Sequence, residues 1–156
     1  MSNLFNAALK HLSAKNCSTN ELKSILEKEF SSIPNIDEKI EKTIVRLKEL
    51  HLINDNYIAS SQAQRYQHKG NRFIAQKLQQ KGFDDEFIDD TIQSLPSEFE
   101  RALAEARKKI RSMASLEPKA KENKLLRFLS SRGFNASTCY QVLNELKDID
   151  AVDEYT

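Results

Sequence analysis

The sequence predicts an all-α protein of three tandem three-helix repeats that form an elongated, curved body. Helix-forming residues dominate its 156 residues, whereas only three glycines and three prolines are available for turns. Apolar residues recur at spacings of three and four, which is the period of amphipathic helices. One pattern of six apolar positions occurs twice without a gap, which indicates that one helical unit is used more than once.

The repeated pattern surrounds two glycine motifs, LQQKGF from Leu78 and LSSRGF from Leu129. Successive apolar positions are separated by 4, 5, 5, 4 and 3 residues in both copies: Ile74, Leu78, Phe83, Ile88, Ile92 and Leu95, then Leu125, Leu129, Phe134, Cys139, Leu143 and Leu146. Glycine can close a helix in the left-handed conformation, so each motif predicts a Schellman cap with a leucine–phenylalanine contact. Asp84 in one copy, and Asn135 or Ser137 in the other, can cap the following helix.

A first repeat precedes these two copies in a modified form. Ser18 and Glu21 have the spacing of a capping box at the start of a helix. Ile40, Ile44 and Leu47 then follow the spacing seen at the end of the other two copies, although the corner before them is four residues longer and has no glycine.

Another helical segment precedes each of the three corners, at residues 4–15, 55–69 and 98–113. The three predicted repeats therefore cover residues 4–53, 54–95 and 96–147 of one continuous body. Repeats of this kind bury their apolar faces on their neighbours, which is why we expect an elongated and curved protein.

Composition excludes several classes of protein. No apolar run exceeds four residues, so we expect no membrane span, and the start MSNLFNAALKHL lacks the basic and apolar regions of a signal peptide. Cys17 and Cys139 are far apart and have no CxxC partner, which fits a reducing compartment. We therefore expect a cytoplasmic protein.

No catalytic or metal-binding pattern is present in the sequence. His11, His51 and His68 share no metal-ligand spacing, and neither a nucleophile motif nor a glycine-rich phosphate loop accompanies them. The carboxylates of residues 84–90 could pair as acid and base, but they are more simply explained as the first turn of a capped helix. We therefore expect a protein without enzymatic activity, bound metal or cofactor.

Basic residues are concentrated in two segments although the net charge is only +1. Residues 65–83 contain five basic residues and no acid, and residues 101–132 contain ten basic and three acidic residues. The candidate binding residues are Arg65, Lys69, Arg72, Lys77, Lys81, Arg107, Lys108, Lys109, Arg127 and Arg132. Because stacked repeats align equivalent faces, we expect these residues to share one surface that faces a polyanion.

Other roles remain open for these residues and for the aromatic residues beside them. Lys81 and Arg132 lie at predicted helix ends, where a cation also stabilises the helix dipole. The remaining cations could form solvated faces. Tyr57, Tyr66 and Phe73 could stack on bases, but core packing is favoured for Tyr57 and Phe73, and a contact role only for Tyr66.

The order of these motifs resembles the RecX family of bacterial regulatory proteins over residues 7–146. The first unit carries the matching residues Ala8, Leu9, Ser18, Glu21 and Leu22. The middle unit is the most specific and supplies Asp55, Tyr57, Ala59, Arg65, Lys69, Gly70, Ile74, Leu78, Lys81 and Gly82. The third unit supplies Ala102, Ala106, Arg107, Lys108, Lys109, Arg127, Phe128, Leu129, Arg132, Gly133 and Phe134.

Two features depart from the family pattern. The basic lead into the first corner is reduced to KNCS, which weakens the case for a polyanion contact there, and the tryptophan often found early in the third unit is absent. The resemblance implies a regulator of DNA recombination, repair and the SOS response that binds the RecA–DNA filament and restrains RecA ATPase and strand exchange. It also implies that the protein binds single-stranded DNA directly, with double-stranded DNA as a further ligand. We expect the binding protein to be a monomer.

Two other functions fit the same residues. A helical DNA-binding protein could act independently of RecA, since the sequence predicts helix–turn–helix corners and basic segments. A scaffold that binds only proteins could use its basic faces for solubility alone. Binding to DNA in the absence of RecA distinguishes the first of these from a filament partner, because a transcription regulator binds tightly and with sequence specificity.

Overall fold

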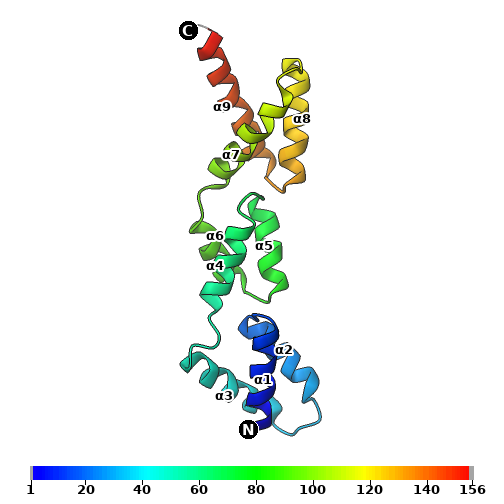
Figure 1. Ribbon diagram of the computed structural model, residues 1–156, viewed down its shortest axis with the longest axis vertical. Coiled ribbons are helices and arrows are strands. Elements are labelled where there is room, and N and C mark those ends of the chain that lie inside the picture. Colours follow the sequence, from blue (N-terminus) through cyan, green and yellow to red (C-terminus); the bar gives the residue numbers. More distant parts are fainter. Residues whose placement is uncertain (1, 155–156) are drawn as a thin grey trace. The chain divides into compact units, whose positions relative to one another are not determined.

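Helices form every regular element in the computed structural model, which describes the backbone of residues 2–154 and the side chains of residues 3–147. The all-α class is therefore confirmed, and the helices follow one another along the chain as Figure 1 shows. Their bounds are α1 Ser2–Ala14, α2 Thr19–Glu29, α3 Ile36–Glu49, α4 Asp55–Arg65, α5 Asn71–Gln80, α6 Asp85–Gln93, α7 Glu98–Ile110, the 3₁₀ turn η1 Arg111–Met113, α8 Pro118–Ser131 and α9 Ala136–Glu154.

The chain divides into two compact units. Unit 1 comprises Met1–Gln62 and Lys77–Thr91, and unit 2 comprises Ala63–Gln76 and Ile92–Thr156. The middle helix triplet, α4 to α6, therefore contributes residues to both units, whereas α1 to α3 belong to unit 1 and α7 to α9 belong to unit 2.

The core of unit 1 is built on the amphipathic faces of α1, α2 and α3. Ile40, Ile44 and Leu47 are buried, as their spacing predicts, and they belong to one cluster with residues of the two preceding helices: Leu4, Ala8, Leu22 and Leu26. The predicted capping box begins α2, because the Ser18 hydroxyl accepts from the Glu21 amide and the Glu21 carboxylate accepts from the Ser18 amide.

Both corner glycines adopt the conformation that the repeat predicts. Gly82 and Gly133 each have a φ of 86°, in the left-handed region. After α5, the amide of Gly82 donates to the carbonyl oxygen of Gln79 at 2.9 Å, and that of Phe83 donates to Leu78 at 3.3 Å. The same two hydrogen bonds follow α8 at 3.0 and 3.3 Å, so both helices end in a Schellman motif.

The predicted caps after these corners are also present. The Asp84 carboxylate accepts from the Phe87 amide at 2.8 Å at the start of α6. The Asn135 side chain accepts from the Thr138 amide at 2.8 Å at the start of α9, so Asn135, and not Ser137, is the residue whose cap bond the structure shows. Each corner therefore consists of a glycine closing one helix and a short polar side chain opening the next.

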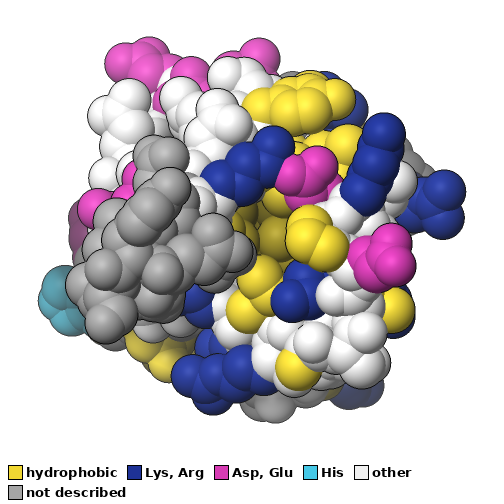
Figure 2. All heavy atoms as spheres, turned by 90° about the horizontal axis from the view of Figure 1, so that it is seen from above, with side chains coloured by type: hydrophobic (Ala, Val, Ile, Leu, Met, Phe, Trp, Pro, Cys, Tyr) yellow, Lys and Arg dark blue, Asp and Glu magenta, His cyan; other side chains and the backbone are white. Residues whose placement is uncertain are grey.

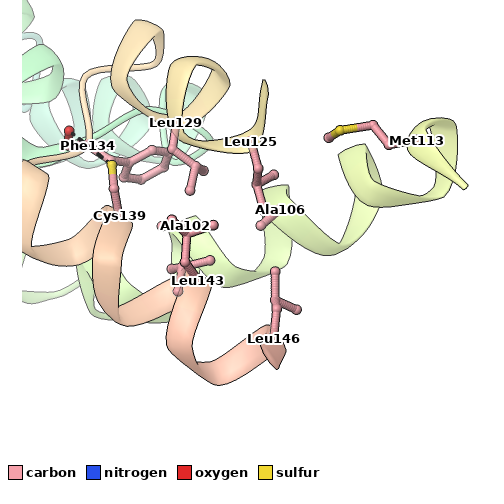
Figure 3. Packing of buried hydrophobic residues seen from close by; sticks show 10 residues of the cluster. Ala102, Ala106, Met113, Leu125, Leu129, Phe134, Cys139, Leu143 and Leu146 are labelled. Carbon is pink, nitrogen blue, oxygen red and sulfur yellow. Dashed lines mark hydrogen bonds between the residues drawn. The ribbon is translucent and has the colours of Figure 1, made fainter. Parts of the chain in front are cut away.

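The core of unit 2 lies between α7, α8 and α9. All six apolar positions of the C-terminal copy are buried there, and Figure 3 shows Leu129, Phe134 and Cys139 facing Ala102 and Leu143. Ala102 and Ala106, both completely buried, provide small side chains on the face of α7 that packs in this core. In the middle copy only Ile74, Leu78 and Ile88 are buried, while the other three positions are half-buried.

One buried hydroxyl in unit 1 leads to a stability prediction. The Thr19 Oγ1 atom has no hydrogen-bond partner among the described residues, whereas the hydroxyl of Thr43, which is also buried, donates to the carbonyl oxygen of Lys39 at 2.9 Å. Replacing Thr19 with valine removes an unpaired polar group, so it should raise the free energy of unfolding by about 1 kcal/mol. The matched substitution Thr43→Val should instead lower it by about 1 kcal/mol. Chemical unfolding followed by circular dichroism gives the denaturant midpoint of each variant. Midpoints that shift in the same direction would contradict the claim that only the Thr19 hydroxyl is unpaired.

Candidate functional site

The candidate site of unit 2 is built on two loops that touch each other. Residues 66–70 connect α4 to α5, and residues 132–135 connect α8 to α9. The amide of Gly70 donates to the carbonyl oxygen of Arg132 at 2.9 Å. A Cβ atom on Gly70 would overlap the carbonyl group of Gly133, so only glycine allows the two backbones to come this close.

Arg101 holds the first of these loops from the first turn of α7. Its side chain is buried, with 5 % of the residue exposed, and its guanidinium donates to the carbonyl oxygens of Lys69 at 2.6 Å and Gln67 at 3.3 Å. It also donates to the carbonyl oxygen of Pro96 at 2.9 Å and to the side chain of Asn71. Burial lowers the pKa of Arg101, and the nearby Glu98 carboxylate opposes this shift.

Glu98 joins the second loop to the first, one turn earlier on α7. Its carboxylate accepts from the Asn71 amide at 2.7 Å, from the Asn135 amide at 3.2 Å and from the Thr138 hydroxyl at 2.8 Å. Glu98 therefore binds the N-terminal ends of α5 and α9 at once, where a negative charge also complements both helix dipoles. Together, Glu98 and Arg101 fix the position of both loops relative to α7.

Unit 1 contains a related arrangement. Asp55, the first residue of α4, accepts from the amide of Thr19 at the start of α2 at 2.9 Å, just as Glu98 of α7 accepts from the start of α5. The hydroxyl of Ser18 donates to the carbonyl oxygen of Lys81, in parallel with the Gly70–Arg132 bond of unit 2. An acidic residue that begins one repeat therefore caps the second helix of the repeat before it.

The loops of unit 2 carry two of the predicted binding residues, Lys69 and Arg132, and each lies over an aromatic ring. Lys69 Nζ lies 4.9 Å from the centre of the Phe73 ring. Arg132 Cζ lies 5.0 Å from the centre of the Phe128 ring. Both distances are within the range of cation–π attraction, which holds the charged group close to the ring.

Two further cations extend this arrangement. Lys109 Nζ lies 5.3 Å from the centre of the same Phe128 ring, so two cations share it. Arg65 Cζ lies 5.6 Å from the centre of the Tyr66 ring, which in turn meets Phe73 edge-on with 5.4 Å between centres. We name this surface the cation–aromatic ridge, and it consists of Arg65, Tyr66, Lys69, Phe73, Lys109, Phe128 and Arg132.

The two halves of the ridge meet where the loops touch. A Cβ atom on Gly133 would lie 3.1 Å from the Cβ atom of Phe73, so the backbone beside Arg132 lies against the residue that holds Lys69. Four predicted binding residues, from α4, α7 and the two loops, are thus connected through three aromatic rings within one unit.

The other six predicted residues lie in different surroundings. Arg72, Arg107 and Arg127 are exposed in unit 2, and Lys108 is exposed beside Glu105, with 3.7 Å between the charged atoms. Lys77 and Lys81 belong to unit 1. Only 16 % of the Lys81 side chain is exposed, and its ammonium group lies 3.5 Å from the Glu21 carboxylate, so it already has an acidic partner within unit 1.

One prediction about the aromatic residues is wrong. Tyr57 was expected to pack in the core, but it is 64 % exposed, because Ile58 and Ala59 provide the buried face of α4. Tyr66 and Phe73 are half-buried and meet edge-on, so both contribute to the ridge.

Two grooves lie in unit 2, and only the first of them shares a residue, Arg65, with the ridge. One, of about 380 Å³, is lined by Arg65, His68, Arg101 and Lys108 but also by the acids Glu100 and Glu105, so its charge is mixed. The other, of about 100 Å³, is apolar and is lined by Ile110, Leu125, Leu143 and Leu146, with an ion pair between Glu122 and Lys147 at 2.7 Å. Figure 2 shows an end of the molecule on which hydrophobic side chains line a hollow among charged ones.

The described part of the chain contains neither a cluster of metal ligands nor a membrane-spanning helix. No group of three or more His, Cys, Asp or Glu side chains is placed there to hold a metal ion. None of the helices there is both long enough and apolar enough to span a membrane. Both thiols are buried, and burial raises the pKa of Cys17 and of Cys139.

Sequence reasoning did not identify Glu98 and Arg101 or assign a role to Gly70. A signal existed for Gly70, because it is the one glycine of the three outside the repeated motif. Another signal existed for part of the ridge, because Lys69 and Phe73, and likewise Phe128 and Arg132, are four residues apart. No local signal distinguishes Glu98 from an ordinary acid in the first turn of a helix.

Known proteins resemble this chain in sequence and in structure. The family model described as RecX, third three-helix domain, matches residues 97–143. The chain is 31 % identical over 153 residues to the regulatory protein RecX of Clostridioides difficile (strain 630), covering 95 % of this chain and 70 % of that protein. It is 33 % identical over 135 residues to the regulatory protein RecX of Chlorobaculum tepidum, covering 84 % and 80 %. The crystal structure of RecX from Lactobacillus salivarius superimposes with a TM-score of 0.75 at 26 % identity, covering 94 % and 96 %.

Proposed function

Because the chain belongs to the RecX family of regulatory proteins, we propose that it binds the RecA–DNA filament and inhibits the RecA ATPase and strand exchange. In this proposal the protein is a non-enzymatic, monomeric regulator. It acts by binding and catalyses no reaction. Its partners are the RecA filament and the DNA within that filament.

The observation that supports this function best is the cation–aromatic ridge of unit 2. Its four cations come from three separate parts of the chain, and the two loops that carry Lys69 and Arg132 are fixed by Glu98 and Arg101. A nucleoprotein filament presents regularly spaced phosphates and acidic side chains, and a fixed array of cations suits such a surface.

The proposal is tested by measuring RecA ATPase on single-stranded DNA while the protein is titrated in. We expect the rate to fall at concentrations comparable to or below that of RecA, since a bound regulator restrains many filament subunits. Strand exchange and filament length provide two further measures. If none of the three changes when the protein is added in excess over RecA, it does not regulate the filament.

A DNA-binding protein that acts without RecA is the second candidate, because the ridge could bind a free strand as well. Its discriminating test is binding to DNA with no RecA present. Weak binding that decreases steeply with salt fits a filament partner, whereas tight binding to one sequence favours a transcription regulator.

A further inference from the structure

We propose that the cation–aromatic ridge binds the phosphodiester backbone of a single strand and does not stack on its bases. This inference rests on the proposed function, because it assumes that the partner contains a nucleic acid. It specifies which residues of the chain meet that nucleic acid and which chemical part of the strand they recognise.

The aromatic rings of the ridge are already occupied by the protein's own cations. Phe128 has both Lys109 and Arg132 over its ring, Phe73 has Lys69, and Tyr66 has Arg65. Base stacking on aromatic side chains requires an accessible ring face, as in single-strand binding proteins. On a ring face that a cation covers, a base would first have to displace that cation, so stacking is disfavoured there.

The charged groups of the ridge are still available for an anion. Among the described residues, none of Arg65, Lys69, Lys109 and Arg132 forms an ion pair. Glu98 of α7, the acid that binds the residues next to both loops, uses its carboxylate on backbone amides and a hydroxyl, and Glu105 pairs with Lys108. Four cations without acidic partners make a surface that attracts phosphate.

The ridge is also fixed in position before a ligand arrives. Arg101 binds the carbonyl oxygen of Lys69, and the carbonyl oxygen of Arg132 accepts from Gly70, so both loop cations start from a rigid backbone. The rings then limit the freedom of the charged side chains, which reduces the entropy lost on binding. Fixed cations suit the regular phosphate spacing of any strand, independent of its sequence.

Fluorescence anisotropy with two labelled strands tests the inference. One strand is oligothymidylate, and the other is an abasic phosphodiester strand of the same length, with no base to stack. We expect the two affinities to agree within about threefold, because both strands offer the same phosphates. Stacking worth about 1–3 kcal/mol per base would weaken the abasic strand at least about fivefold for a single lost contact. A loss of that size or larger would overturn the inference.

The second part of the experiment removes two cations that share one ring. The double variant Lys109→Ala/Arg132→Ala should reduce the slope of log affinity against log salt by about 1.4, or roughly 0.7 per phosphate contact. The double variant Lys109→Gln/Arg132→Gln keeps the side-chain stems over Phe128 and should show the same reduction, so a packing defect in the alanine variant cannot explain the result. The control Lys119→Ala/Lys124→Ala removes two exposed cations of α8 outside the ridge and should keep the wild-type slope.

Two outcomes would contradict the inference that the ridge binds phosphates but would leave the proposed regulation of RecA unaffected. An unchanged slope in both ridge variants would show that these cations do not meet phosphates. Loss of filament inhibition with unchanged binding to the free strand would show that they meet carboxylates of the protein partner instead. The proposed function fails on a different measurement, the absence of any wild-type effect on RecA ATPase, so the two failures are distinguishable.

Discussion

Replacing Gly70 with alanine should lower the free energy of unfolding by about 3 kcal/mol, which is a large effect for adding one methyl group. The added Cβ atom would overlap the carbonyl group of Gly133, and a backbone group cannot move aside as a flexible side chain can. The loops of residues 66–70 and 132–135 would separate, and the Gly70–Arg132 hydrogen bond would be lost. Thermal unfolding followed by circular dichroism should show a melting temperature lower by roughly 6–12 °C.

The matched control for this variant is Ser61→Ala, which introduces the same side chain at an exposed position of α4. It should change the free energy of unfolding by less than about 0.5 kcal/mol. Because Gly70→Ala separates the loops that carry Lys69 and Arg132, it should also weaken single-strand binding at temperatures where the protein is still folded. A Gly70→Ala protein that melts with the wild type would mean that the two loops are not in contact in solution.

Replacing Arg101 with methionine should cost about 3 kcal/mol of unfolding free energy. Methionine keeps most of the buried stem but removes the guanidinium, so the carbonyl oxygens of Lys69, Gln67 and Pro96 lose their donor. Lysine is expected to restore little of this loss, because a single ammonium group cannot reproduce the fork that reaches several acceptors at once.

Arg107→Met is the control for Arg101→Met, since it makes the same replacement at an exposed position of the same helix. Its effect on the free energy of unfolding should be below about 0.5 kcal/mol. Equal melting temperatures for the two variants would contradict the role assigned to Arg101. The losses from Gly70→Ala and Arg101→Met should not add in the double variant, because both loosen the same loop.

The fold class and the corners follow from local rules and could be predicted from the sequence. Helical spacing places Leu125 and Leu129 in the core, and the expected Schellman contact adds Phe134. A glycine just past the end of a helix indicates a left-handed residue, as Gly82 and Gly133 confirm. The end of α3 shows the limit of such rules. His51 takes a φ of 59° there, and the amide of Leu52 donates to the carbonyl oxygen of Leu47. A Schellman motif therefore ends α3 although the left-handed residue is a histidine, which gives no signal in the sequence.

The ridge and its supports could be predicted only in part. Basic residues are visible in the sequence, but the features that distinguish Lys109 from Lys108 are tertiary. Lys109 lies over Phe128 of a different helix, whereas Lys108, one residue earlier, lies beside Glu105 of its own helix. The role of Glu98 likewise depends on where α5 and α9 begin in space, which no spacing along the chain encodes.

The central claim is that this protein acts on the RecA filament through the cation–aromatic ridge. The most direct measurement is the protein concentration that halves RecA ATPase on single-stranded DNA, determined for the wild type, for Lys109→Ala/Arg132→Ala and for Lys119→Ala/Lys124→Ala. We predict that the ridge variant requires at least about tenfold more protein, which corresponds to about 1.4 kcal/mol, while the control variant stays within about twofold of the wild type. A ridge variant that inhibits as well as the wild type does, with its helical content intact, would contradict the claim.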